Sequence, residues 1–385
     1  MMAGPSFTDP QVQALWQAGR IRAAHEASAM PAAATTDHPF RDPIDRLAAA
    51  ARAHEHGTLC WYAARFTECE AALAVARAER TELLGADHPE TLETVERLAA
   101  LAHYRMEPDA PRRFGEVVAR LERVHGAGSV RVAIAERNRA ACLRDHGMVA
   151  QARTMIDRAA AVLVRALPVE HAEVVAAYKV SALLRLAEGE PDAAREEALS
   201  AVELATRVWG AEHPFVAHAE LTVAAAELHL GKLRAARKRM PSVIARIERG
   251  MGSHPMLGLA LATLAEIELE AGQNFLRAEE TARRAIAVYR ETYPGSSAQM
   301  TWTLFRVLYE SGQVVEAGEL VREFAAELPR ELVLGMTAKL ANHLTRLRDF
   351  RGALPWLERT RDLCDDPEVA AQWAAQAERV RREID

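Results

Sequence analysis

The chain has 385 residues, 50% of them hydrophobic and only 5% aromatic, and its 48 Lys and Arg against 54 Asp and Glu give a net charge of −6. This balance argues against a chain-wide nucleic-acid surface, which requires a strong basic excess. Glu and Arg interrupt every apolar run before it reaches the length of a membrane span. The N-terminus lacks the pattern of a signal peptide, and the four cysteines show no CxxC spacing. We therefore expect a cytoplasmic protein with reduced thiols.

A short phrase, typified by Gly-Ala-Glu-His-Pro at Gly210–Pro214, recurs along most of the chain. Its histidines are separated by 83 residues once, which is two periods, and then by 42 and 41 residues. A fixed period of this size predicts stacked supersecondary units. The junctions are Gly85–Pro89, Gly126–Ser129, Leu167–His171, Gly210–Pro214, Gly252–Pro255 and Tyr293–Ser297.

Each period reads as a helical hairpin. The polar residue and His-Pro offer an N-cap and a first-turn proline, and about seventeen residues with helical spacing of apolar positions follow. A glycine then suits the left-handed end of that helix, as at Gly147, Gly189, Gly231, Gly272 and Gly312. One hairpin cannot bury its own apolar face, so neighbouring hairpins must stack.

These junctions, the period near forty-two and the Gly-x-Φ-x-x-Ala turns resemble tetratricopeptide repeats (TPRs) of the kinesin-light-chain-like class. The resemblance covers residues 44–364 and implies an all-α, right-handed superhelical solenoid of about eight hairpins. Outside it we expect an N-terminal helical hairpin or cap over residues 1–36, a linker over 37–43 and a C-terminal capping helix over 365–385.

Fourteen histidines raise the question of a metal site. The junction histidines occur once per unit, and packed helices lie about 10 Å apart, whereas zinc ligands lie about 2 Å from the metal. We therefore predict that His88, His171, His213 and His254 are capping residues and expect no metal. His54-Glu55-His56 also lacks a usual ligand spacing.

No nucleophile elbow, P-loop or dinucleotide-binding glycine pattern occurs. We therefore expect no enzymatic activity and no cofactor, with an enzyme whose scattered groups line a groove as the remaining alternative.

The resemblance also implies which residues line the inner, concave surface, because the family uses fixed positions on the first helix of each hairpin. Counting back from the turn glycine, or from Ala64 and Met106 where it is replaced, gives the candidate partner-binding residues; Arg144 and Thr303 lie at equivalent positions. The candidates are Trp61, Glu96, Arg97, His103, Arg137, Asn138, Lys179, Thr222, Glu266, Trp302, Arg306 and Tyr309.

This set places Arg and Lys early in the chain and Trp and Tyr late. The planar guanidinium group of Arg can bind a carboxylate through two parallel hydrogen bonds. Aromatic rings provide a large contact surface to a partner at a small cost in conformational entropy. The set therefore favours an extended or helical peptide with acidic and apolar groups; the competing interpretation is a merely solvated helix face. The basic run Lys232–Arg239 falls on a second helix and lacks interleaved aromatics, so a solvated outer surface is favoured over nucleic acid.

Several charges fall where the repeat needs large apolar side chains. Buried unpaired charges cost several kcal/mol each, so either the register is off by one or these residues pair between adjacent units. Arg185 and Glu227 occupy equivalent positions in neighbouring units, so in the second case they could meet. The possible polar seam consists of Arg185, Glu220, Glu227 and Glu268.

The leading hypothesis is a non-catalytic scaffold or adaptor that holds a protein or peptide segment in the concave groove. The alternative is a ligand- or peptide-responsive regulatory sensor that acts through a partner, since the N-terminal hairpin is too short and insufficiently basic to bind DNA. The sequence leaves the partner and the oligomeric state open.

Overall fold

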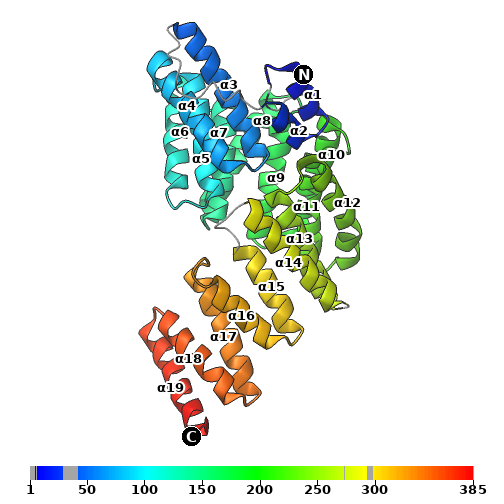
Figure 1. The fold of residues 1–385 in the computed structure, drawn as a ribbon. Coiled ribbons are helices and arrows are strands. Elements are labelled where there is room, and N and C mark those ends of the chain that lie inside the picture. Colours follow the sequence, from blue (N-terminus) through cyan, green and yellow to red (C-terminus); the bar gives the residue numbers. More distant parts are fainter. Residues whose placement is uncertain (1–4, 6, 29–41, 273, 293–297, 385) are drawn as a thin grey trace. The chain divides into compact units, whose positions relative to one another are not determined.

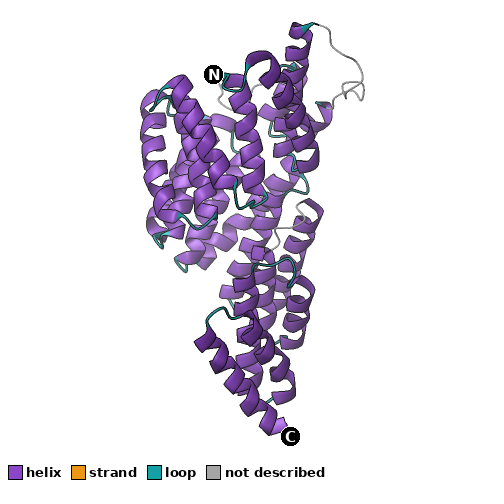
Figure 2. Cartoon of the chain, turned by 90° about the vertical axis from the view of Figure 1, so that its left-hand side faces the viewer, coloured by secondary structure: helices purple, strands orange, loops and turns teal. Residues whose placement is uncertain are grey.

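The computed structural model describes residues 5, 7–28, 42–272, 274–292 and 298–384. This part of the chain holds nineteen helices and no strand (Figure 1, Figure 2). The helices are α1 (Pro10–Gln17), α2 (Ile21–Ala27), α3 (Pro43–Tyr62), α4 (Phe66–Leu84), α5 (Pro89–Tyr104), α6 (Ala110–His125), α7 (Val130–Asp145), α8 (Val149–Ala166), α9 (Ala172–Ala187), α10 (Pro191–Trp209), α11 (Pro214–His229), α12 (Leu233–Met251), α13 (Pro255–Glu270), α14 (Phe275–Thr292), α15 (Ala298–Glu310), α16 (Val314–Phe324), α17 (Arg330–Arg346), α18 (Phe350–Leu363) and α19 (Pro367–Ile384).

Helices α3 to α18 follow one another as eight successive pairs, and α19 packs on α18. The chain divides into two compact units, Met1–Ala260 and Leu261–Asp385, with the boundary inside α13. The all-α stacked-hairpin architecture predicted from the period is confirmed. We call the two parts unit 1 and unit 2 and describe each by itself.

The junction histidines are N-caps, as predicted. In each, Nδ1 accepts a hydrogen bond from the backbone N–H two residues ahead: Glu90 at 3.3 Å, Glu173 at 3.2 Å, Phe215 at 3.2 Å and Met256 at 3.0 Å. A ring nitrogen thus satisfies one of the N–H groups that a helix start leaves without a partner. The geometry also fixes the tautomer, because a neutral ring that accepts at Nδ1 carries its proton at Nε2.

The turn that closes each first helix needs a left-handed residue. Gly147, Gly189 and their equivalents have φ between 64° and 84°, a region that favours glycine. Ala64, Met106 and Arg348 stand in the same place with φ of 59°, 54° and 61°. The positions that the sequence assigns to a replaced turn glycine, Ala64 and Met106, therefore do adopt the glycine conformation.

Within unit 1 the first helices of successive hairpins contact one another along the series α3, α5, α7, α9 and α11. In unit 2, α15 and α17 do the same. We call the surface formed by these first helices the inner wall. Ala152, Ala194 and Ala236, which are fully buried, sit in the second helices where the sequence predicts a small residue, and they allow the paired helices to cross closely.

The N-terminal hairpin α1–α2 joins two distant hairpins of unit 1. Trp16, which is 2% exposed, lies edge-on to Tyr62 of α3 at 4.6 Å and to Phe215 of α11 at 5.5 Å. Tyr62 and Phe215 themselves lie 5.6 Å apart. The hairpin therefore fills the place where the first hairpin of the stack meets the fifth (Figure 1).

Contacts to the backbone of α1–α2 hold this hairpin against α11 and α12. His213 Nε2 donates to the Trp16 carbonyl at 3.3 Å, so one histidine caps α11 and binds α1. A Cβ at Gly250 would lie 2.5 Å from the Gly19 carbonyl oxygen, so only glycine allows this approach.

The predicted linker over 37–43 lies mostly outside the described residues, and its last residue, Pro43, is already the first residue of α3. The turn between α5 and α6 is five residues long. It is tied down, because the ring nitrogen Nε2 of His146 lies 3.2 Å from the Glu107 carbonyl and Ala110 is buried. Of the helices described, none is long and apolar enough to cross a membrane.

Candidate functional site

Basic side chains gather on the inner wall of unit 1. Arg137 and Arg144 lie two turns apart on α7 and therefore on one face, Lys179 lies on α9, and His218 lies on α11. Lys179 Nζ is 3.2 Å from His218 Nδ1. We call these four residues the cationic cluster; three of them are first-helix positions that the resemblance predicts to line the inner surface.

Burial and like charge act together on this cluster. Burial, and then the charges of Arg137 and Arg144, lower the pKa of Lys179 to about 7. Burial, followed by the charge of Lys179, holds the pKa of His218 well below its usual value. His218 is therefore a neutral acceptor for the Lys179 amine at neutral pH. A buried lysine whose pKa is lowered by burial and by neighbouring cations marks a candidate functional site.

The cluster is only partly neutralised by its surroundings. Arg137 pairs with Glu173, and Arg144 pairs with Asp145 at 2.6 Å. Lys179 has no carboxylate partner among the residues described. Two buried donor atoms, Nε of Arg137 and one terminal nitrogen of Arg144, also lack an acceptor. Buried donors without partners are costly, and an incoming carboxylate would satisfy them.

Next to the cluster, a third arginine lies on an aromatic surface. The Arg97 guanidinium is 5.7 Å from the Trp61 ring centroid and 5.9 Å from that of Tyr62. The Trp61 indole Nε1 is buried without an acceptor. His103, also on α5, lies 2.9 Å from Asp145. The structure therefore brings Trp61, Arg97 and His103 to the same inner wall.

Other predicted partner-binding residues of unit 1 are already engaged. Glu96 is 6% exposed, accepts a hydrogen bond from Asn138 Nδ2 at 2.7 Å and pairs with Arg131. Thr222 is buried, and its hydroxyl faces the His218 carbonyl one helical turn back. These three side chains connect neighbouring helices or stabilise their own helix, so they are poorly placed to contact a partner.

The inner wall of unit 2 is aromatic and has paired charges. Trp302, Phe305 and Tyr309 stack along α15 with centroid separations of 5.7 and 5.8 Å, and Lys339 of α17 lies 5.8 Å from the Tyr309 ring. Arg306 pairs with Glu270 at 2.6 Å and with Glu310 at 3.2 Å.

Glu266 of unit 2 accepts from the Thr303 hydroxyl at 2.8 Å. The charged predicted residues of this unit, Glu266 and Arg306, therefore already have partners within the unit.

The possible polar seam lies between packed helices, both within a hairpin and between neighbouring hairpins. Arg185 pairs with Glu197 at 3.3 Å and Glu190 at 2.6 Å, and Glu227 pairs with Arg239 at 3.1 Å and Arg195 at 3.4 Å. Arg185 therefore does not pair with Glu227, but Glu227 does pair with an adjacent hairpin, through Arg195 of α10.

Arg185–Glu197 and Glu227–Arg239 occupy the same repeat positions with the charges exchanged, because each pair is twelve residues apart and the pairs are one 42-residue period apart. Glu220 with Arg246, and Glu268 with Arg277 at 2.8 Å, likewise pair across a hairpin. The seam is part of the packing between helices and does not form a ligand surface.

Comparison with known proteins gives no family model and no curated protein that matches. Solved structures do match. A Rap protein complexed with Competence and Sporulation Factor is 12% identical, with 87% of this chain and 98% of that chain covered and a TM-score of 0.59. The Cut9–Hcn1 hetero-tetramer of the APC/C is 14% identical, with 93% and 59% covered and a TM-score of 0.61.

A putative kinesin light chain from Podosopora anserina with TPR-like repeats is 21% identical over 53% of this chain and 97% of its own, with a TM-score of 0.42. The likeness to the Rap and Cut9 structures shows that the chain has a TPR-like fold. At these identities the comparisons establish the fold alone.

In TPR terms, each pair from α3/α4 to α17/α18 is one repeat. Two hollows described on the surface lie between repeats rather than on the inner wall. The larger, of about 390 Å³, lies between α8 and α9 and has mainly small and apolar lining residues. Packing between alanine-rich repeats accounts for it.

Sequence reasoning missed two features of the TPR stack. His218 joins the cationic cluster from a position that the repeat count does not select, although it lies one helical turn before Thr222. His25, His56, Cys60 and Glu68 come close together, although three of these residues were not considered as ligands. The signal available was His56 and Cys60, four apart and on one helix face.

Proposed function

We propose that this TPR protein is a non-catalytic scaffold that binds a protein or peptide segment along the inner wall, and that the cationic cluster of unit 1 receives a carboxylate of that segment. The observation that carries the proposal is Lys179, which lies between Arg137 and Arg144 without a carboxylate partner among the described residues. A carboxylate placed there restores the Lys179 charge and satisfies the buried donors of both arginines.

The neighbouring residues suggest what surrounds that carboxylate. Trp61 and Tyr62, with Arg97 across their rings, offer an apolar surface with a positive edge. Large aromatic and arginine side chains dominate the binding energy of protein interfaces. The proposed partner is therefore an acidic segment with an adjacent aromatic or aliphatic side chain. Such a role fits Rap and Cut9, whose structures are of complexes with Competence and Sporulation Factor and with Hcn1.

A regulatory sensor is the second candidate, favoured by the likeness to Rap, which is seen with a factor bound. In that case the segment would alter how this protein meets a further partner. Both roles use the same cluster and differ in the consequence of binding. A cytoplasmic location is part of the proposal, since Cys60, Cys69 and Cys142 are buried free thiols.

The test is binding of an array of short peptides to the full chain, followed by affinity measurement for the best binders. We expect enrichment of Asp, Glu or a free C-terminal carboxylate, and at least about tenfold weaker binding by Lys179→Met. Lys232→Met is the matched control, because Lys232 lies at the start of α12 and pairs with Asp192 at 3.7 Å. Equal affinity of the wild type and Lys179→Met would refute the assignment of the cluster.

The pH dependence gives an independent signature. With a free pKa of about 7, Lys179 is only half charged at neutral pH, and a bound carboxylate favours its charged form. Binding then takes up a proton above pH 7. Affinity is expected to fall as pH rises from 7 to 9, by up to about tenfold per pH unit, and Lys179→Met is expected to lose this dependence.

A further inference from the structure

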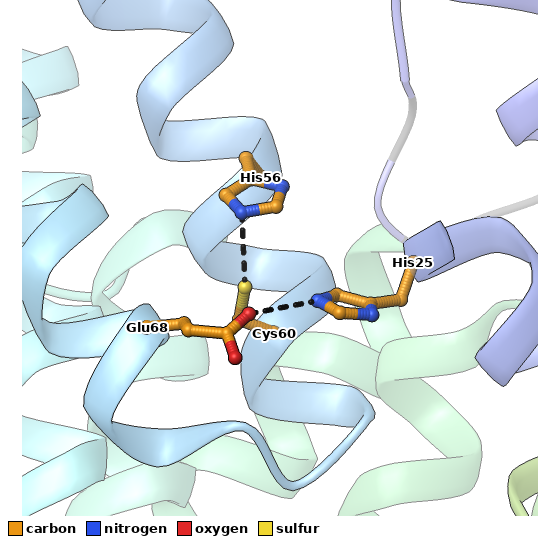
Figure 3. Close-up of side chains that lie close together, drawn as sticks. All are labelled: His25, His56, Cys60 and Glu68. Carbon is orange, nitrogen blue, oxygen red and sulfur yellow. Dashed lines mark hydrogen bonds and ion pairs between the residues drawn. The ribbon is translucent and has the colours of Figure 1, made fainter. Parts of the chain in front are cut away.

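Four side chains from three helices converge near the N-terminus of unit 1. His25 comes from α2, His56 and Cys60 from α3, and Glu68 from α4, and one ligand atom of each lies within 4.8 Å of all the others (Figure 3). Figure 3 shows the His56 ring above the Cys60 sulfur and the Glu68 carboxylate facing the His25 ring. Imidazole, thiolate and carboxylate are the ligands that zinc takes in proteins.

The separations fit a small tetrahedral ion. His56 Nε2 lies 3.4 Å from Cys60 Sγ, and His25 Nε2 lies 3.5 Å from Glu68 Oε2. Ligands about 2.0–2.3 Å from a tetrahedral zinc are about 3.3–3.8 Å from each other. Two edges of the tetrahedron therefore already have the required length, and the other pairs of ligand atoms, all within 4.8 Å, need to shorten by at most about 1.5 Å.

The hydrogen bonds turn the lone pair of His56 toward this centre. Ser28 Oγ donates its only proton to the His25 carbonyl at 2.8 Å. It must therefore accept from His56 Nδ1, which lies 3.2 Å away, and this leaves the lone pair of His56 on Nε2, facing Cys60. Hydrogen bonds of this kind orient metal-binding histidines.

The Nε2 atom of His25 faces the same centre. This atom is buried and has no hydrogen-bond partner among the described residues, although Glu68 lies 3.5 Å away. Arg65 holds the other oxygen of Glu68, at 2.8 Å, and so orients the carboxylate.

We propose that His25, His56, Cys60 and Glu68 bind one zinc ion as a structural site that fastens the N-terminal hairpin to the first repeat. Four protein ligands fill a tetrahedral zinc completely, which is typical of a structural rather than a catalytic site. Two neutral imidazoles, one thiolate and one carboxylate balance the two positive charges of the ion. Binding forms the zinc–sulfur bond and releases the Cys60 thiol proton to solvent, one proton per zinc.

The site has a mechanical role that follows from the fold. The α1–α2 hairpin meets α3 at Trp16 and Tyr62, and it reaches α11 through Trp16 and Phe215. Zinc would add a bond between α2 and the α3/α4 hairpin, and it would thereby hold the hairpin in its place between the first and fifth repeats.

The experiment uses the full chain, stripped of metal by a chelator and kept reduced. Cobalt(II) titration is expected to give one ion per chain, with tetrahedral ligand-field bands and a thiolate-to-cobalt charge-transfer band that zinc abolishes. Cys60→Ser is expected to lose the charge-transfer band, and His25→Gln to bind zinc at least about tenfold more weakly. Cys69→Ser is the matched control, because Cys69 is buried one residue after Glu68 and lies outside the cluster.

Two results would overturn the proposal: wild-type protein that binds no stoichiometric cobalt, or a charge-transfer band that survives in Cys60→Ser. The wild-type titration does not depend on whether a variant folds, and circular dichroism checks each variant. Zinc is also expected to raise the melting temperature of the wild type and of Cys69→Ser but not of Cys60→Ser.

Discussion

The inner walls of the two units use the same repeat positions for different chemistry. In unit 1, Lys179 lies among arginines and lacks a carboxylate partner in the described part of the chain, whereas in unit 2 Arg306 has both Glu270 and Glu310. Aromatic side chains in unit 2 stack on one another, whereas Trp61 and Tyr62 in unit 1 face Arg97. A cation that is paired with a carboxylate of the same chain contributes to stability. Burying a cation without such a carboxylate costs free energy, which a bound carboxylate from a ligand offsets. The difference therefore directs the search for a partner to unit 1.

The largest expected effect separates the units by stability. Trp16→Ala removes a side chain that is 2% exposed and packs against α3 and α11. Such truncations cost about 3–5 kcal/mol, and only unit 1 contains these contacts. Hydrogen exchange monitored by mass spectrometry is expected to show faster exchange in α3 and α11 and unchanged exchange in α15 to α18. Uniform acceleration throughout the chain would contradict this assignment.

The second-largest expected effect is a loss of stability of unit 1 at acidic pH. Burial lowers the pKa of His213 to about 4, against an ordinary value of about 6.5. The unfolded chain binds the additional proton between these values, so the stability is complete above pH 6.5 and is lost as pH falls toward 4. The loss at pH 5 is about 2 kcal/mol for this histidine.

Denaturant unfolding at pH 7 and pH 5 measures that loss. His213→Asn keeps a residue that caps helices well but does not titrate, so its stability is expected to depend less on pH. An unchanged pH dependence in this variant would show that other groups are responsible.

Replacing the inner-wall cations tests the comparison directly, because the two units should respond with opposite signs. Lys179→Met keeps the apolar stem and removes a desolvated amine that has no carboxylate partner among the described residues, so we expect unit 1 to gain about 1 kcal/mol. Arg306→Met breaks two partly exposed ion pairs, so we expect unit 2 to lose about 0.5–1 kcal/mol. Urea unfolding of both variants measures these changes. A destabilised Lys179→Met protein would mean that the hydrogen bond from Lys179 to His218 outweighs the cost of burying the amine.

The smallest expected change in stability comes from substitutions at the turns and should be equal in the two units. Met106 and Arg348 have positive φ at the turn that glycine occupies elsewhere. Met106→Gly and Arg348→Gly relieve this strain but increase the entropy of the unfolded chain, so each is expected to gain about 0.5 kcal/mol. Thermal unfolding measures it, and Gly147→Ala, with φ of 77°, is the reverse control that should lose stability.

What the sequence revealed followed from local rules, and what it missed involved distant residues. The junction histidines were identified as caps because the hydrogen bond runs to the second residue ahead. The sequence shows that the charges at Arg185 and Glu227 are anomalous but does not show their partners, because these lie on other helices of the same hairpin or of the preceding one.

Long-range contacts were beyond the repeat argument altogether. The zinc ligands come from α2, α3 and α4, and only His56 and Cys60 share a helix. The contact of α1 with α11 depends on how far successive repeats rotate, which a period in the sequence does not specify. For the same reason the repeat count selected Lys179 but not the neighbouring His218.

The bond between His213 and the Trp16 carbonyl joins residues 197 positions apart. On the ribosome, where chains grow at about 5–20 residues per second, some 10–40 seconds separate the appearance of the two ends of this bond. During that interval Trp16 has no α11 to cover it, although the first repeats can already stack. Newly made α1 is therefore an exposed apolar segment for the time that four repeats take to emerge, and its docking completes unit 1 only after most of that unit has folded.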